Sequence, residues 1–225
     1  MAPITMKTIL LCGACVGLLS CSVVAADEVV LVDDFKGKLA QGWSWLREDP
    51  NAWRVTDRGL EVRVQPGNMW GPSNNARNVL VRLVPDPSQG EVEVSLTVEN
   101  QPTEQYEQVD LVWYYSDSFM VKLGQELVDG KLSIVMGREE GDRTRTIAIV
   151  PLATKVVRLR LTVSGNRIQG QFRPGNQGEW QSAGTCDLPV PPQGKAQVSV
   201  QCYQGPANTE RWAKLTEFRL VRRPK

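Results

Sequence analysis

The chain has 225 residues, 41% of them hydrophobic, with 26 basic residues, 25 acidic residues and no histidine. This length and apolar content suit one folded β domain rather than a disordered chain. A net charge of +1 argues against nucleic acid or an anionic membrane as a partner, because both need a strongly basic surface. The absence of histidine excludes Ser-His-Asp and Cys-His nucleophile pairs and histidine-ligated zinc.

Residues 1–26 have the pattern of a secretory signal. Lys7 precedes the apolar run TILLCGACVGLL, and VVAADE places small residues at the −3 and −1 positions of a cut after Ala26. The run is too short to span a bilayer, and no other segment predicts a transmembrane helix. A competing cut at LLSC would make Cys21 the lipidated residue of a lipoprotein. Either cut predicts export, with residues 27–225 forming a single domain.

Short runs with period-two alternation recur along the rest of the chain. In order they are GLEVRV (59–64), EVEVSLTV (91–98), VDLVWYY (109–115), VVRLRLTV (156–163), RIQGQF (167–172), AQVSVQC (196–202) and EFRLV (217–221). Turn residues such as DPSQG, VDG, SGN and PGNQG separate them, and no long segment shows a capped period of 3.6. The pattern predicts an all-β antiparallel sandwich of about a dozen strands.

The order of motifs resembles a known family. VDDFKG and GWSWLREDPNAW precede GLEVRV, and the central block is EQYEQVDLVWYYSDSFMVKLGQELVDGKLSIVMGRE. This order is similar to bacterial uncharacterised concanavalin A-like domains related to the C-terminal domain of family-43 β-xylosidases. Lys122, Glu126 and the VDG turn stand where that family shows a lysine, a glutamate and an Asp/Gly turn. The resemblance implies a concanavalin A-like jelly-roll sandwich of two antiparallel sheets, and it implies little about activity.

The central block predicts a polar set on one side of its strands. Alternation points Trp113 and Tyr115 to the core and Tyr114 away from it. The outward set consists of Asp110, Tyr114, Lys122 and Glu126, on an outer face that we expect to be the concave one. Polar groups beside an aromatic ring suit a sugar, whose hydroxyls and ring face they bind. The alternative is a solvated sheet face held by ordinary cross-strand charge pairs.

A second stretch, QPGNMWGPSNNARN, places Trp70 among glycine, proline and asparagine residues between two strands. On a rigid loop at the sandwich edge, Trp70 and Asn74, with Asn75, would extend the sugar surface. The alternative is that Trp70 folds back to cap the core.

Two cysteines remain after a cut behind Ala26. Cys186 and Cys202 flank the turn-rich PVPPQG, and in an exported chain they could bridge neighbouring strands. The alternative is a buried free thiol at Cys202, which continues the apolar face of AQVSVQC. We favour the disulfide of these two.

Catalysis is the weaker hypothesis. Glycoside hydrolysis needs paired carboxylates on a cleft, and the ExDxxE strand motif of concanavalin-like hydrolases does not occur in the chain. The candidate carboxylates are Glu107, Asp110 and Glu126. No cofactor or metal site is predicted; calcium remains an alternative, with oxygen ligands from Asp33, Asp34 and Glu217 on adjacent terminal strands.

The sequence therefore predicts an exported carbohydrate-binding or lectin-like domain with polysaccharide as partner and without catalysis. Two alternatives stay open. One is a glycoside hydrolase that uses carboxylates, and the other is a structural or protein-binding module of the cell envelope.

Overall fold

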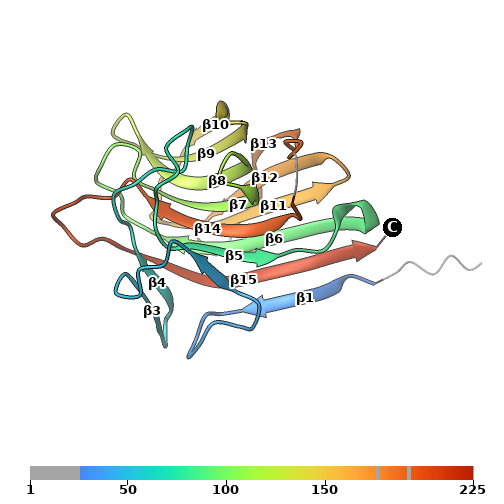
Figure 1. Cartoon of the computed structure of the whole chain (residues 1–225), viewed down its shortest axis with the longest axis horizontal. Coiled ribbons are helices and arrows are strands. Elements are labelled where there is room, and N and C mark those ends of the chain that lie inside the picture. The colour runs from blue at the N-terminus through green and yellow to red at the C-terminus, as the bar shows by residue number, and fades with distance from the viewer. Residues whose placement is uncertain (1–25, 176–177, 192–193, 225) are drawn as a thin grey trace, which may run out of the picture.

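The computed structural model describes residues 26–175, 178–191 and 194–224. Within these ranges the chain is all-β, with one short 3-10 turn, η1 (Pro87–Gln89), and no α-helix. Two antiparallel sheets form the two layers of a sandwich (Figure 1). No helix among the described residues has the length and apolar character needed to cross a membrane. The predicted signal segment, including Cys21, lies outside the described residues.

The first layer, sheet A, has eight strands in the order β13-β12-β11-β6-β15-β4-β3, with β1 also paired to β15. Its strands are β1 (Glu28–Asp33), β3 (Trp53–Thr56), β4 (Gly59–Arg63), β6 (Gly90–Glu99), β11 (Val156–Ser164), β12 (Arg167–Pro174), β13 (Gln181–Asp187) and β15 (Trp212–Pro224). The pairing of β15 with β6 shifts register between Thr216 and Arg219, where Glu217 has a φ of 53°. This irregularity divides β15 into one half that pairs with β4 and one that pairs with β1.

The second layer, sheet B, has seven strands in the order β10-β9-β8-β7-β14-β5-β2. Its strands are β2 (Ser44–Leu46), β5 (Val79–Leu83), β7 (Gln108–Ser116), β8 (Phe119–Val128), β9 (Lys131–Glu140), β10 (Arg143–Pro151) and β14 (Gln197–Tyr203). The predicted all-β sandwich of two antiparallel sheets is confirmed.

The main apolar core, called the interlayer core here, fills the space between the two sheets. It contains the inward-facing residues that the alternation predicts, among them Leu96, Trp113, Leu123 and Leu159, all with 0% exposure. In sheet A, β11 follows the period of two closely, because buried and half-buried residues alternate along most of its length. The sequence pattern therefore assigns the inner face correctly for the strands whose alternation it shows, β4, β6, β7, β11, β12, β14 and β15.

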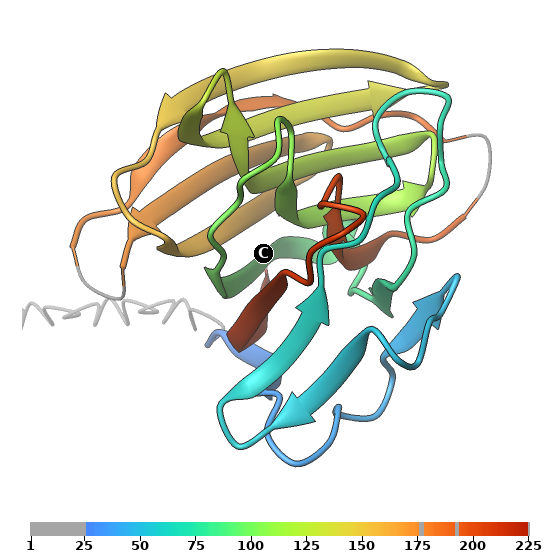
Figure 2. The same cartoon turned by 90° about the vertical axis from the view of Figure 1, so that its left-hand side faces the viewer.

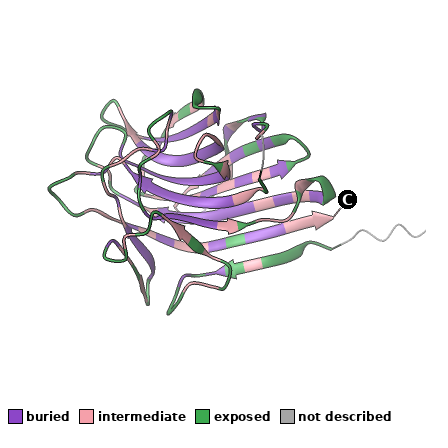
Figure 3. Cartoon of the chain, viewed as in Figure 1, coloured by how far each residue is buried: buried purple, intermediate pink, exposed green. Residues whose placement is uncertain are grey.

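A second apolar cluster lies on the opposite face of sheet B. We call it the outer cluster, and its residues are Met69, Ala76, Val79, Val81, Val112, Tyr114, Met120 and Tyr203. It is covered by segment 64–78 between β4 and β5, which runs across the strands of sheet B (Figure 2) and reaches Gly137 and Glu139 of β9. As a result β7, β8 and β14 are buried along most of their length (Figure 3).

The outer cluster corrects the prediction for Tyr114. The parity is right, since Trp113 lies in the interlayer core and Tyr114 on the other face. The predicted exposure is wrong, because the side chain is 5% exposed beneath segment 64–78. The Tyr114 hydroxyl donates to Asp117 Oδ1 at 2.7 Å, and Asp117 pairs with Arg47 at 2.7 Å. Burial is the main cause that raises the pKa of Tyr114.

The two cysteines do not form the predicted disulfide. Cys186 lies in β13 at the edge of sheet A, and Cys202 lies in β14 within sheet B. Both thiols are free and buried. The prediction assumed neighbouring strands, but the chain between the two cysteines crosses from one sheet to the other. Burial raises the pKa of both thiols, so neither is activated as a thiolate.

Candidate functional site

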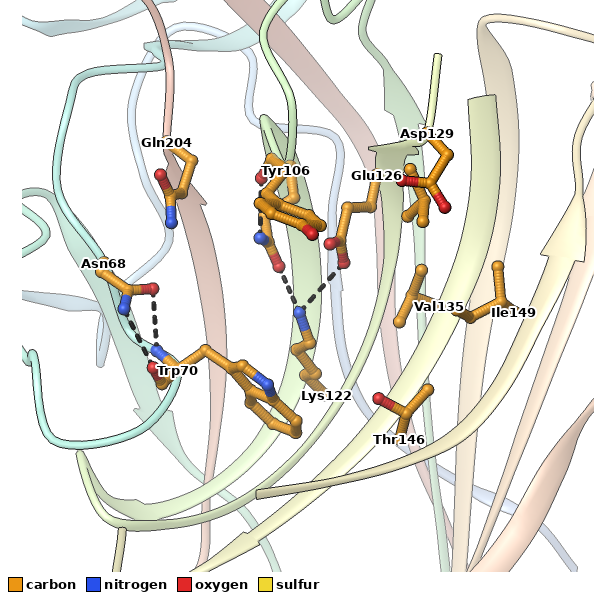
Figure 4. Close-up of a pocket in the computed structure, with 12 residues that line it drawn as sticks. Asn68, Trp70, Tyr106, Lys122, Glu126, Asp129, Val135, Thr146, Ile149 and Gln204 are labelled. Atoms are coloured by element: carbon orange, nitrogen blue, oxygen red, sulfur yellow. Dashed lines mark hydrogen bonds and ion pairs between the residues drawn. The ribbon is translucent and has the colours of Figure 1, made fainter. Parts of the chain in front are cut away.

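A pocket of about 460 Å³ lies on the outer face of sheet B (Figure 4). Strands β7 to β10 form its floor, Asp129 from the β8–β9 turn lies at one edge, and side chains from three further loops form its rim. The rim residues are Asn68 and Trp70 from segment 64–78, Tyr106 from the turn before β7, and Gln204 after β14. The pocket therefore combines residues that are far apart in the sequence.

Lys122 on β8 provides the positive charge of the pocket. Its side chain is 3% exposed, and its ammonium group donates to Gln108 Oε1 and, at 3.1 Å, to Glu126 Oε2. The same nitrogen lies 4.0 Å from Asp110 Oδ2 and 4.8 Å from the centroid of the Trp70 ring. These carboxylates and the aromatic face compensate the cost of burying the charge.

Asp110 lies beneath Lys122 and is fully buried. Burial raises the pKa of its carboxyl group to about 6, and the nearby Lys122 charge opposes that rise. Asp110 faces Gly124 across the β7–β8 ladder, and a Cβ at Gly124 would overlap Asp110 Oδ1. Glycine is therefore required at this position of β8 for the carboxylate to lie there.

Glu139 on β9 fastens the covering loop to sheet B. Its Oε2 accepts a hydrogen bond from the Gly71 backbone N–H at 3.1 Å, and burial raises the pKa of this carboxyl group to about 7. The Trp70 ring lies directly on the backbone of Gly137, where a Cβ would overlap it. Trp70 is thus half-buried against sheet B and the outer cluster, not against the interlayer core.

Two rim residues adopt left-handed backbone conformations. Tyr106 has a φ of 68° and Gln204 a φ of 61°, which are uncommon for residues other than glycine. The Tyr106 N–H donates to Leu127 O at 2.8 Å, and the Gln204 N–H donates to Gly67 O at 3.2 Å. Tyr106 is 48% exposed, and its ring lies at the pocket beside Glu126 (Figure 4). Such conformations persist when neighbouring contacts impose them, and they concentrate at functional sites.

Side chains also fix the turn that carries Tyr106. Glu107 accepts hydrogen bonds from the backbone N–H groups of Thr103 and Glu104, at 2.7 and 3.2 Å. Gln105 and Asp129 exchange two hydrogen bonds, at 3.1 and 3.2 Å, which connect the turn to the β8–β9 hairpin. The rim is therefore attached to the sheet on both sides of the exposed tyrosine.

Three of the predicted binding residues line the pocket: Trp70, Lys122 and Glu126. Asp110 supports Lys122 from below, and Asn74 lies outside the pocket lining. The expectation of a solvated polar face is wrong for Asp110, Lys122 and Glu126, which are 0%, 2% and 6% exposed. Segment 64–78 and the 104–107 turn cover this face, which a strand pattern does not reveal.

Sequence reasoning missed Tyr106, Gln108 and Gln204. Tyr106 and Gln108 stand in the EQYEQ stretch that opens the central block, where an aromatic residue within a polar turn is a usable signal. Gln204 gives no comparable signal, because its position depends on the contact of the 204–205 loop with segment 64–78.

The structure does not place the carboxylates proposed for glycoside hydrolysis as a pair open to one cleft, although Asp110 and Glu126 both lie near Lys122. Of Glu107, Asp110 and Glu126, Glu126 lines the pocket. Glu107 is fully buried and accepts hydrogen bonds from its own turn, and Asp110 is fully buried under Lys122. The three groups therefore do not face one another across the pocket as a cleft pair would.

The residues considered for calcium lie close together, on or next to β1 and β15 as expected, with Asp33 opposite Phe218. However, Asp33 accepts hydrogen bonds from the Phe35 and Ala40 backbones and from Trp43 Nε1, at 2.8 to 3.0 Å. Glu217 pairs with Arg158 at 2.9 Å. In the described ranges, no group of three or more His, Cys, Asp or Glu residues is placed to hold a metal ion.

The family model for the β-xylosidase C-terminal concanavalin A-like domain matches residues 32–190 of the chain. The chain belongs to this family. No curated protein sequence matches it.

Solved structures with the same fold include GH43 enzymes. The chain is 17% identical to the GH43 protein BlXynB from Bacillus licheniformis, with a TM-score of 0.73 over 85% of this chain and 39% of that one. It is 22% identical to a xylan β-1,4-xylosidase from Bacillus halodurans C-125, with a TM-score of 0.72 over 84% and 38%. The chain thus spans 38–39% of the length of these two proteins.

A protein of unknown function from Saccharomyces cerevisiae also matches, at 14% identity and a TM-score of 0.61. The match covers 80% of this chain and 96% of that one, so the fold also occurs as nearly a whole protein. These structural similarities show the fold. Membership of the family makes the chain a carbohydrate-related module.

Proposed function

We propose that the chain is an exported module that binds carbohydrate in the pocket of sheet B, without evident catalysis. The observation that carries the proposal is the placement of the exposed Tyr106 ring and the half-buried Trp70 ring beside the buried Lys122–Glu126 pair. An aromatic face beside fixed donors and acceptors matches a sugar, which has an apolar ring face and polar edges.

The polar groups of the pocket suit neighbouring sugar hydroxyls. The Lys122 ammonium has three N–H donors, of which Gln108 and Glu126 take two. The third N–H and the second carboxylate oxygen of Glu126 would serve one hydroxyl as donor and another as acceptor. Because the surrounding chain already holds Lys122 in place, little side-chain entropy is lost on binding.

The family context supports a carbohydrate ligand. The matched domain is that of β-xylosidases, and one structural neighbour is a xylan β-1,4-xylosidase. We carry over only the association with carbohydrate, since this chain spans less than half of that enzyme.

The alternatives fit the pocket less well. A hydrolase needs two facing carboxylates, and the other carboxylate of the lining, Asp129, is tied to Gln105. A purely structural module would be expected to leave no aromatic ring exposed above a polar cluster, whereas Tyr106 is 48% exposed.

Export is part of the proposal and rests on the N-terminal sequence. Mass spectrometry of the mature chain should find Asp27 at the N-terminus after simple secretion. A diacylglyceryl-modified Cys21 would instead identify an anchored lipoprotein, and an intact Met1 in the cytoplasm would contradict export.

Affinity gel electrophoresis tests the binding site. Gels containing xylan, β-glucan or mannan should retard the mature protein, and Tyr106→Ala should lower the affinity about tenfold, equivalent to about 1.4 kcal/mol. Trp180→Ala is the matched control. Trp180 lies away from the pocket, and its ring stacks on the Arg160 guanidinium, whose Cζ lies 3.9 Å from the ring centroid. Absence of retardation in every polysaccharide, or equal retardation of wild type and Tyr106→Ala, would overturn the proposal.

A further inference from the structure

A second hollow of about 520 Å³ adjoins the pocket. It is lined by Glu104 and Gln105, by Pro66 of segment 64–78, and by Gln204 to Thr209. Gln204 lines both the pocket and the hollow, and Tyr106 directly follows the residues that line the hollow. Tyr106 and Gln204 therefore form a low ridge between two adjacent depressions, and both lie on the side of the pocket away from Thr146 (Figure 4).

The ridge is fixed from below. Gly205 donates a hydrogen bond to Gln65 O at 3.0 Å, and a Cβ at Gly205 would overlap Val64 O. On the other side of the ridge, the Glu107 carboxylate holds the turn that carries Tyr106. The pocket and the hollow thus keep a constant separation, as successive subsites for one extended ligand require.

The charges of the two depressions indicate the class of ligand. Lys122 is the cation among the lining residues, and Glu126 and Asp110 already surround it. Glu104 and Asp129 add further negative charge to the lining. An acidic glycan would meet uncompensated like charges, which disfavour binding.

We propose that the ligand is an uncharged glycan chain of at least two sugar units. One ring occupies the pocket against Trp70 and Tyr106, and the next unit crosses Gln204 into the hollow. This inference rests on the proposed carbohydrate binding and adds to it the length and the charge of the ligand.

The test compares chain lengths by isothermal titration calorimetry with the mature protein. The probes are xylose and xylotetraose, glucose and cellotetraose, and trigalacturonate as the acidic glycan. In at least one neutral series the tetrasaccharide should bind about tenfold or more tightly than the monosaccharide, equivalent to about 1.4 kcal/mol. Trigalacturonate should bind more weakly than that tetrasaccharide.

A blocking variant localises the effect. Ala207 is exposed and lines the hollow, so Ala207→Trp should fill it and reduce tetrasaccharide affinity to that of the monosaccharide. Monosaccharide affinity should not change. Ala153→Trp, at an exposed alanine that lines neither depression, is the matched control and should leave both affinities unchanged.

The outcomes separate the two proposals. Binding of monosaccharide and tetrasaccharide with equal affinity, or tetrasaccharide affinity unaffected by Ala207→Trp, overturns the two-subsite groove and leaves the carbohydrate pocket standing. If trigalacturonate binds more tightly than every neutral tetrasaccharide, the inference that the ligand is uncharged is overturned. No binding of any probe overturns the carbohydrate pocket itself and the groove with it.

Discussion

The two sheets of the sandwich differ in what covers their outer faces. In sheet A, β11 alternates between buried and half-buried residues, and its outward arginines form ion pairs near the surface, such as Arg158 with Glu217. In sheet B, β8 is buried from Met120 to Glu126 on both faces. The sequence of β14 alternates like that of β11, yet β14 is buried on both faces over most of its length. Alternation thus identifies the inner face of a strand, but not the environment of the outer one.

This difference decides where a site can form. The most exposed charge pairs on sheet A, such as Arg167 with Asp187, are screened by solvent, so they contribute little to stability. On sheet B, segment 64–78 and the 104–107 turn enclose Lys122, Asp110 and Glu126 in a buried environment, where charge interactions are strong and the partners of each group are fixed. If sheet B packs against the interlayer core on one face and the outer cluster on the other, substitutions on both faces should destabilise the protein.

The largest effect is expected at the interlayer core. Trp113→Ala should lower the free energy of unfolding by about 3–5 kcal/mol, because a large aromatic side chain leaves a cavity that two packed sheets cannot close. Denaturant unfolding of the mature protein measures it. A loss under about 1 kcal/mol would mean that Trp113 does not lie between the sheets.

Tyr114→Ala tests the outer cluster. Since its ring is buried under segment 64–78, we expect a loss of about 2–4 kcal/mol, much more than a surface residue would show. Tyr114→Phe is the control and should cost about 1 kcal/mol, because it removes the hydrogen bond to Asp117 and keeps the ring. If Tyr114→Ala stays within about 0.5 kcal/mol, the face is open to solvent in solution.

The pH dependence of stability tests how segment 64–78 is held to sheet B through Glu139. Burial raises the pKa of Glu139 from 4.5 to about 7, so the folded state binds this proton more tightly than the unfolded chain does. The contribution of Glu139 to the free energy of unfolding should therefore fall as pH rises from 4.5 to about 7. Glu139→Gln, which keeps an acceptor for the Gly71 N–H, removes this dependence.

Relative to wild type, Glu139→Gln should accordingly be more stable at pH 7.5 than at pH 4, by about 2 kcal/mol. Denaturant unfolding of both proteins at each pH gives the difference, in which the other titrating groups largely cancel. Asp142, Asp117 and Lys122 also act on Glu139 and are unchanged in the variant. A difference that does not vary with pH would show that Glu139 is not buried under the loop.

The smallest change in stability is expected at the rim. Tyr106→Ala removes a ring that is 48% exposed, so the free energy of unfolding should change by no more than about 0.5 kcal/mol. The same variant should lose carbohydrate affinity, which distinguishes a binding residue from a packing residue. A loss of stability close to that of Tyr114→Ala would place Tyr106 in the core instead.

The sequence by itself determined the fold class, the inner face of the strands that alternate, and the interlayer-core residues of those strands, including Trp113 and Leu159. It could do so because a period of two is a local property, and each alternating run reports its own buried side. Lys122 and Glu126 were also placed on the correct face by the same parity.

Only the tertiary structure decided that this face is covered, that Tyr114 is buried, that Tyr106 and Gln204 complete a pocket, and that the cysteines lie in different sheets. The contacts responsible join residues remote in sequence: Gly71 to Glu139 over 68 positions, and Arg47 to Asp117 over 70. No local period encodes which loop will lie on which sheet, because that depends on the joint free energy of all the segments that meet there.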